Sequence, residues 1–277
     1  MASRPPVRVA LLQMTSGIDP AENAAAIVSA VYAAAAGGAE MLFTPEMSNL
    51  IDRDRKRASP NVVAEELDPV LAAAREAAAT AGIWVALGSL AIARGDDRFA
   101  NRAFVINAAG EIAGRYDKLH MFDVDLDTGE TWRESKAYAP GDALCVVDDT
   151  PLGRLGVTIC YDIRFPALFE ALGNRRCDVI AIPAAFTVPT GRDHWHILQR
   201  ARAIEASAFV LSAAQVGLHA DGRETYGHSL AVDPWGAVLL DMGGEDARLG
   251  FVDLDMARIA NVRKQLPSLA NRRVIPT

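Results

Sequence analysis

Cysteine is scarce in this sequence. Among 277 residues only Cys145, Cys160 and Cys177 are cysteines, and no two of them stand in a CxxC pair. An odd number of thiols at these spacings argues against a disulfide framework and against a thiolate zinc site. Cys145 and Cys177 lie in apolar stretches, so both are predicted to be core residues.

Positive charge is also in deficit. The chain has 28 Lys and Arg against 35 Asp and Glu, which gives a formal net charge of -7. This balance argues against a nucleic-acid partner and against an anionic membrane surface as a partner. No apolar run reaches the length of a transmembrane helix, and the first residues contain no apolar signal core. We therefore expect a cytoplasmic protein.

Apolar residues are abundant and suffice for a large core, since they make up 51% of the chain. Strand-like runs alternate with helices in the first part. There Asp19 and Asp68, each followed by proline, predict helix starts, and Gly37 and Gly82 predict helix ends. Hairpin patterns follow later in the chain. We predict a single α/β domain over residues 1–277, with two sheets covered by helices on the outside.

Three further segments bear on later results. Ile197, Ala201 and Ile204 recur at helical spacing and predict the apolar face of a helix over residues 192–206. The residues from Met256 onward are expected to form a charged tail. Residues 48–67 and 123–143 are polar and irregular and are expected to form loops.

Cys160 stands at a position that suits a nucleophile. Leu155, Val157 and Ile159 form a β-branched and apolar run that predicts a strand, and Pro166 suits the first turn of a following helix. A side chain at such a strand end lies on rigid backbone at the mouth of a sheet, where backbone N–H groups can converge. The alternative interpretation is that Cys160 is an ordinary buried cysteine that ends an apolar strand.

A reactive thiol needs a base or a cation beside it. Histidine is the usual partner, but the spacing of the five histidines favours none of them. A carboxylate base with a lysine is the other solution. Glu46 follows a short apolar strand and Lys118 follows the predicted hairpin, although either could equally be a solvated surface charge.

Three segments together resemble the nitrilase superfamily of carbon–nitrogen hydrolases. They are residues 43–46 (Phe-Thr-Pro-Glu), 115–120 (Arg-Tyr-Asp-Lys-Leu-His) and 156–166 (Gly-Val-Thr-Ile-Cys-Tyr-Asp-Ile-Arg-Phe-Pro). Their order and separations fit the family as well. The resemblance implies a four-layer αββα sandwich, a homodimer, and a site built from Glu, Lys and Cys.

The same resemblance implies a role for each matching residue. Glu46 would be the general base and Cys160 the nucleophile. Lys118 and the backbone N–H of Tyr161 would stabilise the oxyanion, and Glu134 would help to position substrate or water. Neither a metal nor an organic cofactor is implied, and the sequence contains no phosphate-binding glycine loop.

Substrate contacts are expected from Phe186, Thr187 and the family's His194-Trp195 pair. Arg164, four residues after the nucleophile, could grip a substrate carboxylate through two parallel hydrogen bonds. Alternatively, it could pair with Asp162 or a helix acid and only brace its loop.

Several later segments resemble the Nit branch of the superfamily. They are residues 183–187, 190–191, 194–195, 200–205, 213–215 and 226–229. Within that branch the chain looks more like the amidases of deaminated glutathione than like the ω-amidases acting on α-ketoglutaramate. The expected reaction is hydrolysis of a small amide that carries a carboxylate, to acid and ammonia. The irregular segments 48–67 and 123–143 are expected to form the walls of the site.

Other functions remain open at this point. An ω-amidase, a true nitrilase or an N-carbamoyl amino acid hydrolase would carry the same three residues. A non-catalytic binding protein on the same fold is the alternative from another class. The helix that ends near Ala206 and the helix after Cys160 are the expected contact surfaces of the dimer.

Overall fold

Two six-stranded sheets packed face to face form the centre of the molecule. The computed structural model describes residues 5–127 and 129–273. The first sheet runs in the order β16 (Arg248–Leu254), β1 (Val7–Gln13), β2 (Met41–Phe43), β3 (Trp84–Ala93), β4 (Phe99–Ile106) and β5 (Ile112–Asp117). The second runs in the order β15 (Val238–Asp241), β14 (Leu230–Val232), β11 (Phe209–Ser212), β10 (Val179–Ala181), β9 (Gly153–Val157) and β8 (Cys145–Thr150).

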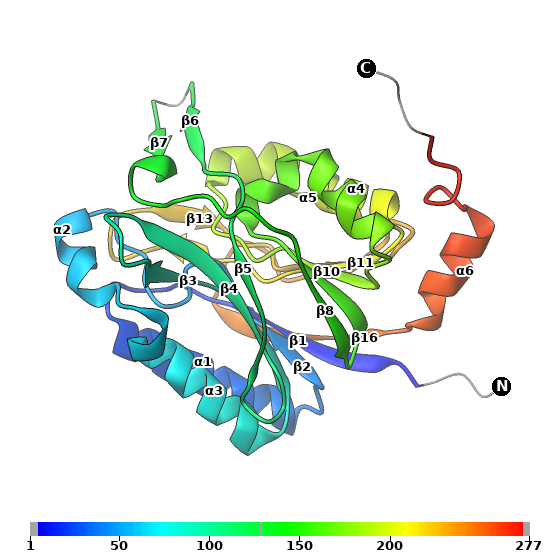
Figure 1. The fold of residues 1–277 in the computed structure, drawn as a ribbon, viewed down its shortest axis with the longest axis horizontal. Coiled ribbons are helices and arrows are strands. Elements are labelled where there is room, and N and C mark those ends of the chain that lie inside the picture. Colours follow the sequence, from blue (N-terminus) through cyan, green and yellow to red (C-terminus); the bar gives the residue numbers. More distant parts are fainter. Residues whose placement is uncertain (1–4, 128, 274–277) are drawn as a thin grey trace.

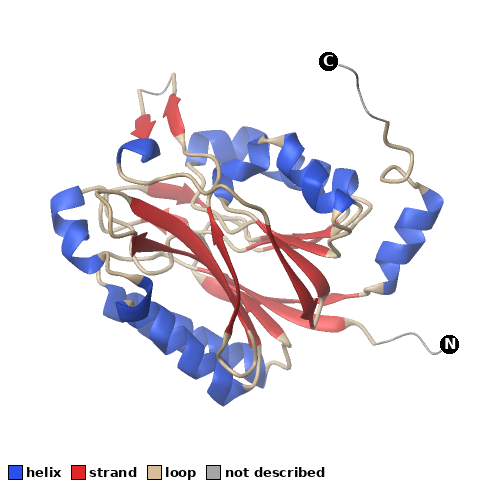
Figure 2. Ribbon diagram, in the orientation of Figure 1, coloured by secondary structure: helices blue, strands red, loops and turns tan. Residues whose placement is uncertain are grey.

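Helices cover the outer faces of both sheets (Figures 1 and 2). The first sheet carries α1 (Pro20–Ala36) and α3 (Pro69–Ala81), and the second carries α4 (Pro166–Asn174) and α5 (Val188–Ala206). This is the four-layer αββα sandwich that the sequence predicted. No helix among residues 5–127 and 129–273 is both long and apolar enough to span a membrane.

Local sequence sets the helix ends where they were predicted. The carboxylate of Asp19 accepts a hydrogen bond of 2.8 Å from the Ala21 N–H, and that of Asp68 accepts one of 2.8 Å from the Leu71 N–H. A cap of this kind stabilises a helix by about 1 kcal/mol. Gly82 ends α3 with φ 68, a left-handed conformation that glycine adopts without strain.

The main core lies between the two sheets. Val9 and Leu11 of β1 and Leu155 and Val179 of the second sheet are each 0% exposed and belong to one apolar cluster. Burying one such side chain stabilises the fold by about 1.5–3 kcal/mol. This core therefore fixes the two sheets against each other and, with them, any group that stands at their edges.

Parallel pairing brings several strand ends to the same place. β2 pairs in parallel with both β1 and β3, and β10 pairs in parallel with both β9 and β11. The carboxyl ends of these strands are therefore neighbours in each sheet. In β3, a Cβ on Gly88 would overlap the carbonyl oxygens of Thr44 and Pro45. The absence of a side chain at Gly88 lets the chain after β2 cross β3 at backbone contact distance.

The apolar face predicted for the helix over residues 192–206 does not pack into the core of this chain, and the helix is α5 (Val188–Ala206). Ile197 is 69% exposed and Ile204 is 43% exposed. The buried face instead includes the polar Gln199, which accepts a hydrogen bond of 2.8 Å from the Ser212 hydroxyl, and Arg202. A count of apolar residues alone misses this face because its polar members are paired.

The charged tail expected after Met256 is also wrong in part, because it contains the helix α6 (Ala257–Gln265). Ile259 and Val262 of this helix are buried. Arg263 donates to the carbonyl oxygens of Cys177 and Ser207 at 2.6 and 3.2 Å. The charged side chains thus attach α6 to the body of the molecule.

The irregular segments contain short elements. Segment 48–67 holds α2 (Arg55–Ala58) and the 3₁₀ turns η1 (Ser59–Asn61) and η2 (Glu65–Leu67). Segment 123–143 holds the hairpin β6 (Asp123–Asp125) and β7 (Thr131–Arg133), followed by the turn η3 (Glu134–Lys136). A further hairpin, β12 (Val216–Leu218) and β13 (Glu224–Tyr226), follows β11.

Two of the three cysteines occupy structural positions. Cys177 is fully buried and burial raises its pKa to about 12. Cys145 is half-buried at the edge of the core, and burial raises its pKa to about 11. The core prediction is confirmed for Cys177 and holds for Cys145 only as a residue that packs against the core.

Candidate active site

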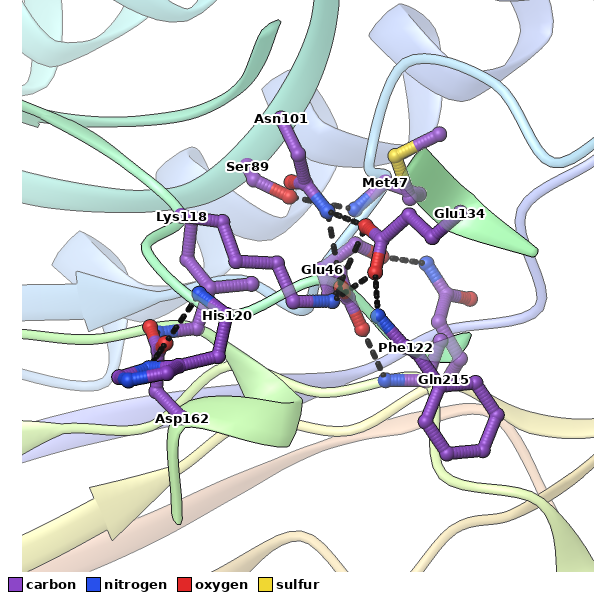
Figure 3. A network of polar contacts seen from close by, with 12 residues as sticks. Glu46, Met47, Ser89, Asn101, Lys118, His120, Phe122, Glu134, Asp162 and Gln215 are labelled. Carbon is purple, nitrogen blue, oxygen red and sulfur yellow. Dashed lines mark hydrogen bonds and ion pairs between the residues drawn. The ribbon is translucent and has the colours of Figure 1, made fainter. Parts of the chain in front are cut away.

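Glu46 stands at the end of a strand of the first sheet and is held in place by contacts from the second sheet. It follows β2 and is 4% exposed. Its Oε2 accepts a hydrogen bond of 2.9 Å from the Ala185 N–H, which follows β10. Its carbonyl oxygen accepts one of 2.9 Å from Gln215 Nε2, which follows β11 (Figure 3). The carboxylate and the backbone of Glu46 are therefore fixed by residues 139 and 169 positions away in the chain, respectively.

Lys118 bridges two carboxylates. It follows β5 and is 2% exposed. Its Nζ lies 2.8 Å from Glu46 Oε1 and 2.9 Å from Glu134 Oε2, and Figure 3 shows the ammonium between the two acids. Glu134 is further fixed by the Phe122 N–H, which donates to Oε2 at 2.7 Å. The structure thus brings together Glu46, Lys118 and Glu134, which the sequence separates by up to 88 positions.

Asn101 is a site residue that the sequence analysis missed. Its Nδ2 donates to Glu46 Oε1 at 2.9 Å and to Glu134 Oε1 at 3.1 Å. It lies on β4, and its carbonyl oxygen accepts the Lys118 N–H at 2.9 Å, so the two residues are neighbours across the hairpin. The one clue in the sequence was its position, because Asn101 immediately precedes the predicted hairpin that Lys118 follows.

Cys160 begins the 3₁₀ turn η4 (Cys160–Arg164), three residues after the last residue of β9. Its backbone is left-handed, with φ 48, and its N–H donates to the Pro183 carbonyl oxygen at 2.9 Å. Such a conformation costs a non-glycine residue of order 1–3 kcal/mol and is common at functional sites. The thiol lies beside the Glu46 carboxylate, close enough that each group shifts the pKa of the other. The side chain is 8% exposed, so it reaches solvent only through the cavity above it.

The protonation states follow from burial and from the neighbouring charges. Burial alone would raise the pKa of Glu46, but the charge of Lys118 and the hydrogen bonds from Lys118, Cys160 and Asn101 outweigh it and lower that pKa. Burial would lower the pKa of Lys118, but Glu134 and Glu46 raise it well above its ordinary value. Burial and the charge of Glu46 raise the pKa of Cys160. The resting site therefore holds a neutral thiol beside an ionised carboxylate and a charged lysine.

Asp162 fixes the turn that carries Cys160. Its Oδ2 accepts hydrogen bonds from the Tyr116 hydroxyl at 2.7 Å and from the Ile159 N–H at 2.9 Å. Its Oδ1 accepts one from the His120 N–H at 3.1 Å, and the His120 ring nitrogen Nδ1 lies 2.7 Å from the same oxygen. Asp162 is thereby fully engaged, and the suggested pairing of Arg164 with Asp162 does not occur.

Arg164 instead lines the cavity above Cys160. Its Nη1 lies 3.2 Å from His194 Nδ1, and its guanidinium stands 5.9 Å from the centre of the Tyr161 ring and 5.3 Å from that of Phe186. These contacts orient the guanidinium without neutralising it, so it can still receive an anion.

A cavity of about 250 Å³ opens above the three catalytic candidates. Glu46, Lys118 and Cys160 contribute to its lining, as do Tyr161, Phe186 and Thr187. Segments 48–67 and 123–143 both supply wall residues, as expected. A cavity of this size accommodates a small linear amide.

The expected contacts from His194 and Trp195 do not fit the structure. Trp195 is 0% exposed, packs against Phe186 at 4.8 Å between ring centres, and donates to the His228 carbonyl oxygen at 2.9 Å. It is a core residue that supports a cavity wall. His194 is exposed and is not among the residues that line the cavity. Its effect on substrate would pass through Arg164.

A possible metal-ligand group lies elsewhere. The ligand atoms of His196, His228 and Asp241 lie within 4.8 Å of one another. Asp241 already lies 2.9 Å from a ring nitrogen of each histidine, which explains the cluster as a hydrogen-bonded network. None of the three belongs to the described residues that line the cavity.

Comparison with known proteins places this arrangement in a family. The chain is 40% identical over 272 residues to a deaminated glutathione amidase of Yersinia enterocolitica, covering 96% of this chain and 93% of that protein. The NitFhit protein of C. elegans superposes with a TM-score of 0.89 at 33% identity, and the match spans 98% of this chain and 66% of that one.

A third relative is an amidase from Nesterenkonia sp. AN1. It superposes with a TM-score of 0.81 at 27% identity, over 97% of this chain and 94% of that one. Its structure, of a Glu-to-Gln mutant, shows the acetamide moiety of fluoroacetamide added covalently at the active site cysteine. Residues 8–264 match the carbon–nitrogen hydrolase family as a whole. The family inferred from the three sequence segments is thus confirmed, and the chain belongs to the carbon–nitrogen hydrolases.

Proposed function

We propose that this hydrolase is an amidase in which Cys160 is the nucleophile, Glu46 the general base and Lys118 the oxyanion stabiliser. The observation that carries the proposal is a neutral thiol beside an ionised, buried carboxylate, with a charged lysine 2.8 Å from that carboxylate, at the floor of a cavity. The membership of the family supports the same reaction class.

In the first half-reaction Glu46 accepts the thiol proton while Cys160 sulfur attacks the amide carbonyl carbon. The C=O π electrons move to oxygen, where Lys118 and the Tyr161 N–H stabilise the negative charge. When the carbonyl reforms, the C–N bond breaks, and protonated Glu46 returns its proton to the departing amine. The product on the enzyme is a thioester of Cys160.

In the second half-reaction Glu46 takes a proton from water, which attacks the thioester carbonyl. The new oxyanion uses the same donors, and collapse releases the acid and restores the thiol with the proton from Glu46. Glu134 is held by Lys118, Asn101 and the Phe122 N–H, so we assign it to positioning Lys118. No step requires a metal or an organic cofactor.

The proposed substrate is deaminated glutathione, in keeping with the named function of the Yersinia relative. In this compound the amide nitrogen belongs to cysteinylglycine and the acyl group is a 2-oxoglutarate unit. Its hydrolysis releases 2-oxoglutarate and cysteinylglycine. The ammonia expected from the sequence is therefore wrong for this substrate, and it applies only to primary amides such as α-ketoglutaramate.

Arg164 is proposed to hold the carboxylate of the acyl group. Its uncompensated guanidinium over Tyr161 and Phe186 supports this role. α-Ketoglutaramate carries the same acyl group, so an ω-amidase is the second candidate. A non-catalytic binding protein is an alternative that the first experiment below separates. An N-carbamoyl amino acid hydrolase is an alternative that the comparison of substrates separates.

Replacing Cys160 should abolish hydrolysis, and replacing Lys118 should slow it strongly. Cys160→Ala is expected to give no product with an unchanged circular dichroism spectrum. Lys118→Met is expected to lower kcat by at least about 10²–10³-fold, because an oxyanion donor is lost and Glu46 also loses the cation that keeps it ionised. The exposed Lys136→Met is the matched control and is expected to stay within about twofold. Product formed by Cys160→Ala, or a rate for Lys118→Met within a few-fold of the wild type, would contradict the assigned roles.

The substrate is decided by comparing two amides with the same acyl group. We expect kcat/KM to be higher for deaminated glutathione, followed by release of 2-oxoglutarate and cysteinylglycine, than for α-ketoglutaramate. A ratio below one assigns the chain to the ω-amidases. If neither compound is hydrolysed, the substrate is instead another amide that carries a carboxylate.

The pH profile distinguishes a carboxylate base from a histidine base. The pKa of Glu46 is lowered from 4.5 and that of Lys118 is raised from 10.5, so Glu46 stays ionised and Lys118 charged at neutral pH. We therefore expect kcat/KM to be level between about pH 6 and pH 9. The assay uses S-methylated deaminated glutathione, because the free thiol of the substrate would otherwise titrate in this pH range. A decline in activity below an apparent pKa near 6.5 would indicate a histidine base instead.

We also propose that the chain acts as a single domain and forms a homodimer through α5 and α4. The exposed Ile197 and Ile204 form an apolar surface on α5, which a partner would cover. Light scattering at micromolar concentration is expected to give twice the monomer mass, and Ile197→Asp is expected to shift it toward the monomer. A monomer mass for the wild type would contradict the proposal. A cytoplasmic location and the absence of a nucleic-acid or membrane partner remain predictions of the sequence.

A further inference from the structure

The cavity carries more positive charge than the assigned roles use. Arg53, Arg55, Arg133 and Arg223 line it in addition to Arg164. Arg133 is neutralised by Asp125, whose two oxygens each lie 2.8 Å from its Nη2. Arg55 donates to the carbonyl oxygens of Lys136 and Asp97 at 3.4 and 3.2 Å.

Arg223 is different because it is buried with an unused donor. Its side chain is 18% exposed, and its Nε is buried without a hydrogen-bond acceptor among residues 5–127 and 129–273. A buried donor left unpaired costs about 1–3 kcal/mol. Because Nε itself is closed to solvent, a ligand reaches this guanidinium through the part of the side chain that lines the cavity.

The surroundings of Arg223 leave a positive charge uncompensated. Its Nη2 lies 3.4 Å from Asp221 Oδ2, and Arg53 Nε lies 3.8 Å from the same oxygen. Asp221 also accepts the backbone N–H groups of Arg53 and Arg223, each at 2.9 Å. The Asp221 carboxylate is therefore shared between two guanidinium groups. Asp52, which also lies close enough to act on Arg223, is paired with Arg57 at 2.7 Å, so three guanidinium groups face two carboxylates here.

The Trp132 ring completes this corner of the cavity. The guanidinium carbon of Arg223 lies 4.8 Å from the ring centre, and that of Arg53 lies 5.4 Å from it. Stacking on an indole restrains a guanidinium without using its N–H donors. Both arginines are thus held in place before a ligand arrives.

A row of aromatic rings connects this corner to Arg164. The Trp132 ring centre lies 6.1 Å from that of Phe122, which lies 5.0 Å from that of Tyr161, over which Arg164 is placed. All three rings line the cavity. One wall of the site therefore presents an apolar row with a guanidinium at each end, suited to an extended ligand with two anionic ends.

We propose that Arg223, supported by Arg53 and Trp132, binds a second carboxylate of the substrate, on the leaving-group side of the scissile amide. This inference rests on the proposed function, in which Arg164 holds the carboxylate of the acyl group. The ligand class is an amide whose leaving amine is a short peptide with a free C-terminal carboxylate. Ammonia, the leaving group of α-ketoglutaramate, carries no carboxylate that could bind to Arg223. Arg223 is therefore a residue that determines specificity between the two candidate substrates.

The test compares two substrates that differ only at the C-terminus: deaminated glutathione and its C-terminal carboxamide. For the wild type we expect kcat/KM to be about 10–100-fold higher for the carboxylate form, since a hydrogen-bonded charge pair is formed only with it. In Arg223→Met, which keeps an unbranched stem against Trp132, this ratio is expected to fall toward one. Arg133→Met removes a neutralised cavity arginine as the matched control and is expected to keep the ratio within about twofold of the wild type.

Each outcome has a distinct meaning. Wild-type turnover of both forms at equal kcat/KM overturns the second carboxylate site while leaving the amidase function in place. An unchanged ratio of the two kcat/KM values in Arg223→Met also overturns the site. So does an equal fall of this ratio in Arg133→Met, because the preference would then come from the overall positive charge of the cavity. Wild-type turnover of neither form overturns the proposed substrate and, with it, this inference. Should Arg223→Met fail to fold, the wild-type comparison of the two substrates decides alone.

Discussion

The ammonium group of Lys118, placed between Glu46 and Glu134, is the interaction on which the site depends. All three groups are withdrawn from solvent, and two acids of like charge at this separation could not both stay ionised without the cation. Removing one partner from such a buried network typically costs 3–5 kcal/mol because it leaves an uncompensated charge. The same ion pairs keep Glu46 ionised and therefore able to accept a proton, so the electrostatic requirement of the fold and that of the chemistry coincide.

The two sheets share the construction of this network. The first sheet supplies the chain ends that carry Glu46 and Lys118, and the second supplies Cys160 and the Ala185 N–H that fixes Glu46. Neither sheet holds a complete site. The apolar core between them, which has no catalytic group of its own beyond Cys160, sets the distance between nucleophile and base.

The sequence predicted those parts of the molecule that depend on local chemistry or on a motif. The helix starts at Asp19 and Asp68 follow from side-chain capping, and Glu46, Lys118 and Cys160 were found through the resemblance of three short segments. Asn101 and Arg223 were missed because their roles depend on partners far away in the chain. The buried face of α5 left no apolar pattern for a related reason: it includes Gln199, whose Oε1 accepts a hydrogen bond from the Ser212 hydroxyl of β11. Polar residues that are paired at long range leave little trace in a local pattern.

The left-handed backbone at Cys160 limits which nucleophiles this scaffold can carry. With φ 48, the residue occupies a region that unbranched side chains enter at moderate cost and β-branched side chains enter only with severe steric strain. Serine could therefore replace cysteine here without a change of backbone, although its hydroxyl is a much weaker acid than a thiol. Threonine, which serves as a nucleophile in other hydrolases, is excluded by backbone geometry before its chemistry is considered. A redesign of the reaction on this fold would accordingly begin from the base and the cavity walls and leave residue 160 unbranched.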